Sequence, residues 1–250
     1  MEKTFLYDAR ATGVSGTVTL PFQDLIQVQA PSALPITGGY SSSKVENFAY
    51  KDILSFRSAS TVTTGSYSEA DQAYNTLVTA TVEGLNIMGV VTADEIVARL
   101  TSKHPKDGGE PSIIPIGSSF TNLRIAGCTV DVHFDMDRFT KCQTYSALRK
   151  ALAEDRQFCA QLSLGQQDLS TRPPNATLLC SAIKEIVPQR AELKPNGNAI
   201  QVPNFGTIHL AEFVVAPYAK SITMIRADLG CAVEGRMLIA HVSGNGQGYP

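Results

Sequence analysis

The feature of this sequence that most limits its fold is a two-residue alternation of apolar and hydroxyl-bearing side chains. In the stretch from Thr76 to Val82, Val78, Ala80 and Val82 occupy one set of alternate positions, and a leucine and two threonines occupy the other. A pleated strand points successive side chains to opposite faces. The alternation therefore predicts a half-buried β-strand.

The same period recurs along the chain. Between Asp131 and Asp137, apolar side chains alternate with three carboxylates and one histidine. The stretch from Thr92 to Leu100 begins like a helix capping box but also alternates, which favours a strand. Residues 208–215 and 237–240 are more uniformly apolar, and we expect central strands covered on both faces there.

One segment has helical rather than strand periodicity. Thr144 can cap a helix, and Leu148, Leu152 and Leu162 then fall on one face of it. Several short strands, irregular turns and one helix predict a mainly β fold. We expect an antiparallel β-sandwich or barrel with one substantial helix at about 144–162.

Glycine and proline mark the breaks between these segments. They predict a single β-rich domain over residues 1–243, with a subdivision near 104–111 or 165–175 as the alternative. The glycine-rich end, residues 244–250, is predicted to be a flexible tail.

Charge and composition limit the classes of partner that the protein can bind. Charged residues make up 18% of the chain, the net charge is −2, and there is no tryptophan. We therefore expect neither nucleic acid nor an anionic membrane as a partner. No apolar run approaches the length of a transmembrane helix. The first residues form no apolar leader, so the chain as written is expected in the cytoplasm, with an exported mature form as the alternative.

The five cysteines are Cys128, Cys142, Cys159, Cys180 and Cys231, and no two are spaced as C-x-x-C. This spacing supports neither a thiol redox motif nor a zinc ribbon. Buried, reduced thiols are expected, because a free cysteine behaves as a small hydrophobic residue. Two disulfides with one free thiol are the alternative.

One short motif resembles catalytic signatures. Tyr40 and Lys44 have the Tyr-x-x-x-Lys spacing of short-chain dehydrogenases, and Ser41 with Lys44 has the Ser-x-x-Lys spacing of penicillin-recognising enzymes. The first needs a glycine-rich dinucleotide turn upstream, and the second needs a helix. The sequence provides neither, so no cofactor is predicted from this motif.

A candidate metal site is the row Asp131, His133 and Asp135, which a strand would place on one face. Carboxylate and imidazole groups in such a row can ligate a metal. Further ligands would come from other strands, among them His209, Glu212 or His241. The alternative is a solvated strand face, on which acidic residues keep an edge from pairing.

Residues 55–84 are rich in serine and threonine that alternate with small apolar residues. Membrane-active β-toxins use such stretches as insertion hairpins, because one face meets lipid and the other meets water. Polar residues, among them Glu69 and Asp71, interrupt the pattern here. An ordinary exposed hairpin is the prediction, and a β-type toxin is an alternative.

Two segments resemble a known class. The stretch from Val82 to Asp94 is similar to the "G-L-x-x-x-G-x-V-T-A-D" segment of bacterial proteins of the choice-of-anchor class. Phe120 to Gly127 resembles the "F-x-N-L-x-I-x-G" strand that follows it, and Asn204 to Leu210 is a looser match. The resemblance implies a β-rich fold and export with a surface anchor, and it implies no catalytic residues.

The sequence thus predicts a β-rich bacterial protein with a non-enzymatic binding or surface-assembly role. An enzyme or metal-binding protein with its site at Asp131, His133 and Asp135 is the first alternative. The membrane-active toxin is the second.

Overall fold

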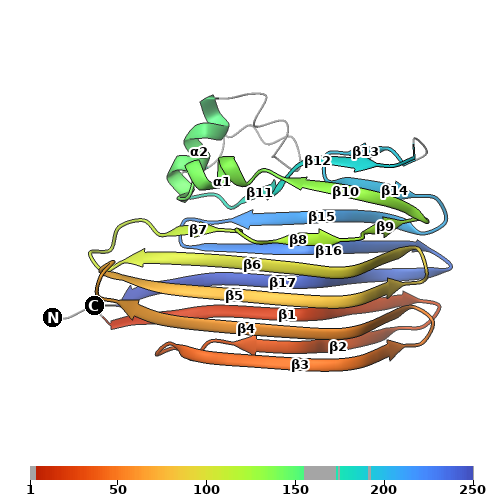
Figure 1. Ribbon diagram of the computed structural model, residues 1–250, viewed down its shortest axis with the longest axis horizontal. Coiled ribbons are helices and arrows are strands. Elements are labelled where there is room, and N and C mark those ends of the chain that lie inside the picture. The colour runs from red at the N-terminus through yellow and green to blue at the C-terminus, as the bar shows by residue number, and fades with distance from the viewer. Residues whose placement is uncertain (1–3, 155–172, 174, 191–192, 250) are drawn as a thin grey trace.

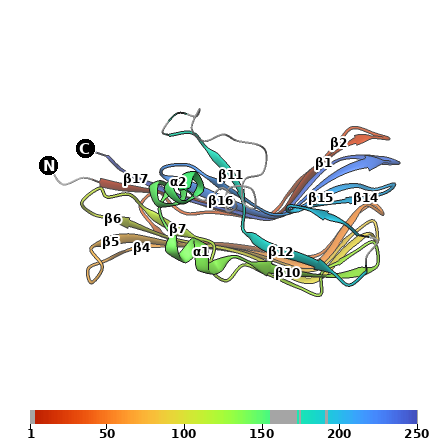
Figure 2. The ribbon, with the colours of Figure 1, turned by 90° about the horizontal axis from the view of Figure 1, so that it is seen from above.

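The protein is a sandwich of two antiparallel sheets, as seen in a computed structural model that describes residues 4–154, 173, 175–190 and 193–249. Figure 1 looks onto the stacked sheets, and Figure 2 shows them edge-on as two layers. The sheets are not closed into a barrel. Of the two architectures expected from the sequence, the sandwich is therefore confirmed.

Sheet A has the strand order β13-β14-β15-β16-β17-β1-β2, and β11 also pairs with β15. Its strands are β1 (Thr4–Leu20), β2 (Asp24–Ala33), β11 (Leu178–Ser181), β13 (Pro195–Asn196), β14 (Ala199–Val202), β15 (Gly206–Val215), β16 (Ala219–Cys231) and β17 (Val233–Tyr249).

Sheet B has the order β12-β10-β9-β6-β5-β4-β3, and β7 and β8 also pair with β6. Its strands are β3 (Gly39–Tyr50), β4 (Leu54–Ser68), β5 (Ala73–Ile87), β6 (Val91–Pro105), β7 (Ser112–Ile114), β8 (Ser119–Thr121), β9 (Arg124–Ile125), β10 (Cys128–Phe134) and β12 (Ile183–Pro188).

The predicted helix is present over the part of its range that the structure describes. The structure describes two short helices, α1 (Met136–Lys141) and α2 (Tyr145–Glu154). The predicted cap is confirmed, because the backbone N–H of Ala147 donates to the Thr144 hydroxyl at 3.2 Å. The rest of the predicted helix, residues 155–162, lies outside the described residues. No described helix has the length and apolar character needed to cross a membrane.

The alternation predicts the core correctly. Val78, Ala80 and Val82 of β5 are completely buried between the sheets, while the residues between them are half-buried on the outer face. The stretch from Thr92 to Leu100 lies in β6, as expected. The alternation after Asp131 ends early, because β10 stops at Phe134 and the next turn is helical.

A row of left-handed backbone conformations crosses both sheets. Positive φ angles occur at Ala30, Ala211 and Ala240 in sheet A, and at Asn47 and Gly84 in sheet B. The ladders keep the same register on either side of these positions but lose one pair there, as between β15 and β16, or two pairs, as between β4 and β5. A residue with positive φ bends a strand. Figure 2 shows both layers turning toward the same side at their right end.

This row of bends also shifts the alternation by one position. In β15, Ile208 and Leu210 point into the core before the bend, and Phe213 and Val215 do so after it. Apolar residues therefore become adjacent at the bend itself. The apolar run at 208–215 reflects this shift, and not two apolar faces, since His209 and Glu212 lie on the outer face.

The glycine-rich end is part of the sheet. Residues 244–249 complete β17 and pair with β1, with Thr4 opposite Tyr249 and Asp8 opposite Asn245. The sequence predicts a flexible tail there because a lone segment of alternating glycines has little to bury. The partner strand comes from the other end of the chain.

Candidate functional site

A hollow of about 280 Å³ opens at one end of the sandwich, at the left of Figure 1, where β1, β5, β6 and β17 begin or end. Its walls come from both sheets and from the turns after β6 and β15. The lining residues are Phe5, Tyr74, His104, Pro105, Lys106, Gly108, Gly109, Pro111, Tyr218, Gly246 and Gln247. We call this hollow the end pocket.

Aromatic rings form the floor of the end pocket. The Phe5 ring on β1 stacks on the Tyr74 ring on β5, with centroids 4.2 Å apart and planes 5° apart. Tyr7 meets the edge of both rings. Each sheet thus contributes one ring to a stacked pair, and this contact fixes the position of the two walls.

Glycine 246 makes room for this stack. A Cβ atom at Gly246 would lie 2.2 Å from Cζ of Phe5, so the Phe5 ring rests directly on the bare backbone of β17. Glycine within a strand often marks such a close approach. Among the alternating glycines at the end of the chain, Gly246 thus serves a packing purpose.

We expect Gly246→Ala to push the Phe5 ring out of the stack and to lower the free energy of unfolding by about 1–3 kcal/mol. The matched control is Gly244→Ala, because a Cβ there meets its nearest atoms at 4.0 Å, an ordinary contact. Urea unfolding of both variants measures the difference. Equal stability of the two would show that Phe5 does not depend on the bare backbone.

His104, near the end of β6, is a buried titratable group of the end pocket. It is 5% exposed, and its ring lies 5.1 Å from the ring of Phe5. Burial lowers the pKa of His104 to about 4, so the imidazole is neutral at physiological pH. Its Nε2 atom is buried and has no hydrogen-bond partner among the described residues. A buried polar atom without a partner is costly, and it marks a position where a ligand group gains a hydrogen bond.

A second hollow of about 390 Å³ lies on the outer face of sheet A, beside Lys220, Ser221 and Ser243. Its charged rim residues, Asp8 and Arg10, pair with each other at 3.1 Å. The Lys220 ammonium donates to the carbonyl oxygens of Ile113 and Gln143, and burial lowers its pKa to about 8. The charged groups beside this hollow are paired within the protein, which favours the end pocket as the candidate site.

The structure keeps two of the three predicted metal ligands on one strand face and places the third, Asp135, beyond the strand. Asp131 and His133 are exposed on the outer face of β10, opposite Val187 and Glu185 of β12. Asp135 lies beyond the strand, where it caps α1 and pairs with Arg138 at 3.1 Å. Among the described residues, no group of three His, Cys, Asp or Glu side chains is placed to hold a metal ion. Metal binding at this row stays a prediction.

The proposed extra ligands lie on the other sheet. His209 and Glu212 on β15 approach each other to 3.8 Å on the outer face of sheet A, and His241 on β17 hydrogen-bonds with Thr223 at 2.8 Å. Arg226 occupies both oxygens of Glu212, at 2.7 and 2.8 Å. The guanidinium of Arg226 therefore occupies the carboxylate oxygens that a metal ion would need as ligands. Sequence reasoning missed this arginine.

Other predicted features are also placed. Tyr40, Ser41 and Lys44 lie on β3 at the edge of sheet B, and no helix or dinucleotide turn of the described part of the chain lies beside them. Residues 55–84 form most of β4 and β5, which pair with each other inside sheet B. Cys128 and Cys142 carry free thiols, and burial raises the pKa of Cys142. Cys159 lies outside the described residues.

The aromatic residues of the end pocket were not recognisable as a set. Phe5, Tyr74 and Tyr218 are far apart in the sequence and belong to no motif. The one available signal was the alternation of glycines at 244, 246 and 248. The sequence alone does not indicate which residues these glycines contact.

The fold and the site define a two-sheet β-sandwich protein with an aromatic pocket at one end. The chain belongs to the family described as Domain of unknown function (DUF8256), which it matches over residues 5–171 and 163–216. No curated protein matches it. No solved structure matches it either. The similarity to choice-of-anchor proteins stays a prediction.

Proposed function

We propose that this protein is a non-enzymatic binding protein that holds a flat aromatic ring of a partner molecule in the end pocket. The observation that carries the proposal is the pairing of a stacked aromatic floor with the buried, unpartnered Nε2 of His104. Concave sites with aromatic walls and a few polar groups are typical ligand sites. The aromatic ring of the ligand stacks on the floor of the end pocket, and a polar substituent on that ring forms a hydrogen bond with Nε2 of His104.

The make-up of the end pocket favours binding over chemistry. Its described lining contains no carboxylate, cysteine, serine or threonine beside the histidine. A general base works best when its pKa lies near the operating pH, and that of His104 is about 4. His104 is thus a weak base at neutral pH, and the described lining offers it no serine, threonine or cysteine nucleophile. As a neutral ring it suits an uncharged ligand.

The rim of the end pocket supplies one exposed aromatic face. Tyr218, in the turn between β15 and β16, is 60% exposed and lines the opening. An exposed tyrosine at the mouth of a pocket can cover a bound ring at small entropic cost. We expect this side chain to form the second wall of the stack when the ligand is bound.

The test uses N-acetyl-tryptophanamide as the probe, because the protein contains no tryptophan. Indole fluorescence then reports the ligand alone. We expect its anisotropy to rise with protein concentration, with a dissociation constant on the order of 1 mM, as suits a small ligand. N-acetyl-leucinamide should not displace it, because it lacks a ring.

Tyr218→Ser should weaken binding by roughly twofold to tenfold, the value of one aromatic contact of about 0.5–1.5 kcal/mol. The matched control is Tyr40→Ser, because Tyr40 is 63% exposed but lies on β3, away from the end pocket. Equal effects of the two substitutions, or an anisotropy that never rises, would contradict the proposed function.

A further inference from the structure

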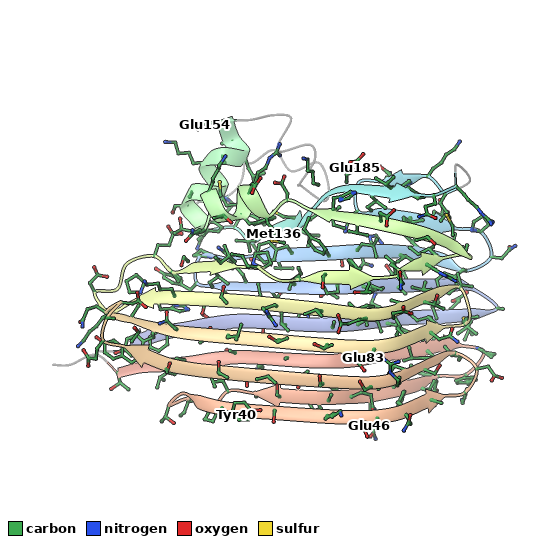
Figure 3. All side chains as sticks on the ribbon, viewed as in Figure 1. Tyr40, Glu46, Glu83, Met136, Glu154 and Glu185 are labelled. Atoms are coloured by element: carbon green, nitrogen blue, oxygen red, sulfur yellow. The ribbon has the colours of Figure 1, made fainter. Side chains whose placement is uncertain are left out.

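Strand β3 is an open sheet edge. It is the last strand of sheet B, and among the described residues its only strand partner is β4. Figure 3 shows Tyr40 and Glu46 on this lowest strand, with no strand beyond it. One side of the β3 backbone therefore presents unpaired N–H and C=O groups, which are a template for another strand.

Of the usual protections of an edge, β3 has two charged side chains and the bend at Asn47, but it lacks proline and is not short. The edge strand of sheet A, β2, contains Pro31, which cannot donate a ladder hydrogen bond. At the far side of sheet B, β12 is only six residues long and ends in Pro188. By contrast, β3 is twelve residues long and contains no proline. Of the four outer strands, it is the one best suited to pairing.

Exposed apolar side chains gather along this side of the sandwich. Eight large hydrophobic side chains are exposed among the described residues, and five of them lie on or between the end of β1 and the start of β3. These five are Leu20, Leu25, Val28, Ile36 and Tyr40. Such clustering marks an interaction surface rather than scattered surface apolarity.

The charges on β3 select one partner, a second copy of the same strand. When two copies pair antiparallel about a twofold axis at Val45, Lys44 of each copy lies opposite Glu46 of the other. Opposite side chains then point to the same face, and both pairs attract. In the isolated chain Lys44 and Glu46 pair with each other at 2.5 Å and are about 60% exposed.

Neighbouring registers are disfavoured. The twofold axis must stand perpendicular to the sheet, so the register can change only in steps that keep outer-face residues opposite each other. One such step places Lys44 opposite Lys44 of the second copy, and the other places Glu46 opposite Glu46. Like charges directly opposite each other are destabilising. Of these three registers, the charges on β3 therefore favour the one centred on Val45.

We propose that the protein forms a reversible homodimer in which the β3 strands of two copies pair antiparallel about Val45 and join their B sheets into one continuous sheet. The assembly is independent of the end pocket, because β3 contributes no lining residue to it. A contact made by one pair of edge strands is small, so we expect a dissociation constant on the order of 10 µM.

The test is sedimentation velocity of the full chain across the micromolar range. We expect a monomer–dimer equilibrium in the wild type. In the Lys44→Glu variant, both contacts across the twofold axis bring two carboxylates together. In the Glu46→Lys variant, both contacts bring two ammonium groups together. Each single variant should therefore weaken dimerisation at least about tenfold. The double variant, Lys44→Glu with Glu46→Lys, should recover the wild-type constant to within about threefold.

Mixing the two single variants gives the sharpest readout. Their heterodimer restores both opposite-charge contacts, so an equimolar mixture should dimerise although neither variant does so alone. The matched control is Arg10→Glu, since Arg10 and Asp8 form a similarly exposed pair two residues apart on β1. It should leave dimerisation unchanged. A wild type that stays monomeric, or a mixture that does not associate, would overturn the proposal.

Discussion

Replacement of Arg226 by methionine is expected to lower the free energy of unfolding by about 3 kcal/mol. Arg226 on β16 holds the carboxylate of Glu212 with two hydrogen bonds and also bonds Asp228, which in turn accepts from Arg236 at 2.6 Å. The side chain of Glu212 is only 11% exposed. Removing one partner of a buried pair leaves the other charge uncompensated, which costs roughly 3–5 kcal/mol.

The position of this network explains why it is buried on an outer face. Arg226 and Glu212 lie beside Met224 and Ala211, where the row of bends crosses β16 and β15. Figure 2 shows sheet A turning away from sheet B there, so its outer face is concave. Side chains on the concave side of a bend converge and shield one another from water.

The matched control for Arg226 is Arg57→Met. Arg57 on β4 also pairs with a glutamate on a neighbouring strand, Glu83 at 3.3 Å, but its side chain is 69% exposed. Exposed pairs contribute about 0–1 kcal/mol. Chemical denaturation should therefore separate the two variants by about 2 kcal/mol. The double variant Arg226→Met with Glu212→Leu should recover most of the loss, because no buried charge is left unpaired.

If Arg226→Met costs no more than Arg57→Met, the network on the outer face of sheet A contributes only as an exposed ion pair does. The concave shape would then not shield it.

Strand identity could be predicted because alternation is a local property. The exposure of every second residue in β5 follows from its sequence and the pleat alone. The bend could not be predicted, because Ala211 and Ala240 are not residues that usually adopt positive φ. Tertiary packing holds them there, and no local signal marks it. The apolar runs at these positions were therefore assigned to burial on both faces.

The site was harder to predict than the fold for the same reason. Asp131, His133 and Asp135 look like a set because they are neighbours in sequence, but the strand ends before Asp135. Phe5 and Tyr74 form a set only after the two sheets are stacked. Single-sequence reasoning can recognise sites on one element. It cannot recognise sites made by contacts between distant elements that carry no motif.

The second large effect is expected in acid. Between pH 6.5 and pH 4 the contribution of His104 to the free energy of unfolding should fall by about 3 kcal/mol. Burial lowers the pKa of His104 from 6.5 to about 4 in the folded protein. In this range the unfolded chain therefore binds a proton that the folded chain does not, and protonation favours unfolding. The contribution is complete above pH 6.5 and is lost as the pH falls toward 4.

His104→Phe isolates this effect from other groups, among them His209 and His241, whose pKa values burial also lowers. Phenylalanine keeps a ring beside Phe5 and removes the unpartnered Nε2, so the variant should be at least as stable as the wild type at pH 7. The two proteins should then diverge below pH 6.5, with the variant losing less stability. Urea unfolding at a series of pH values measures the difference. Parallel stability curves from pH 7 to pH 4 would mean that His104 takes up a proton without leaving its place among the rings, and the end pocket would then have to admit water.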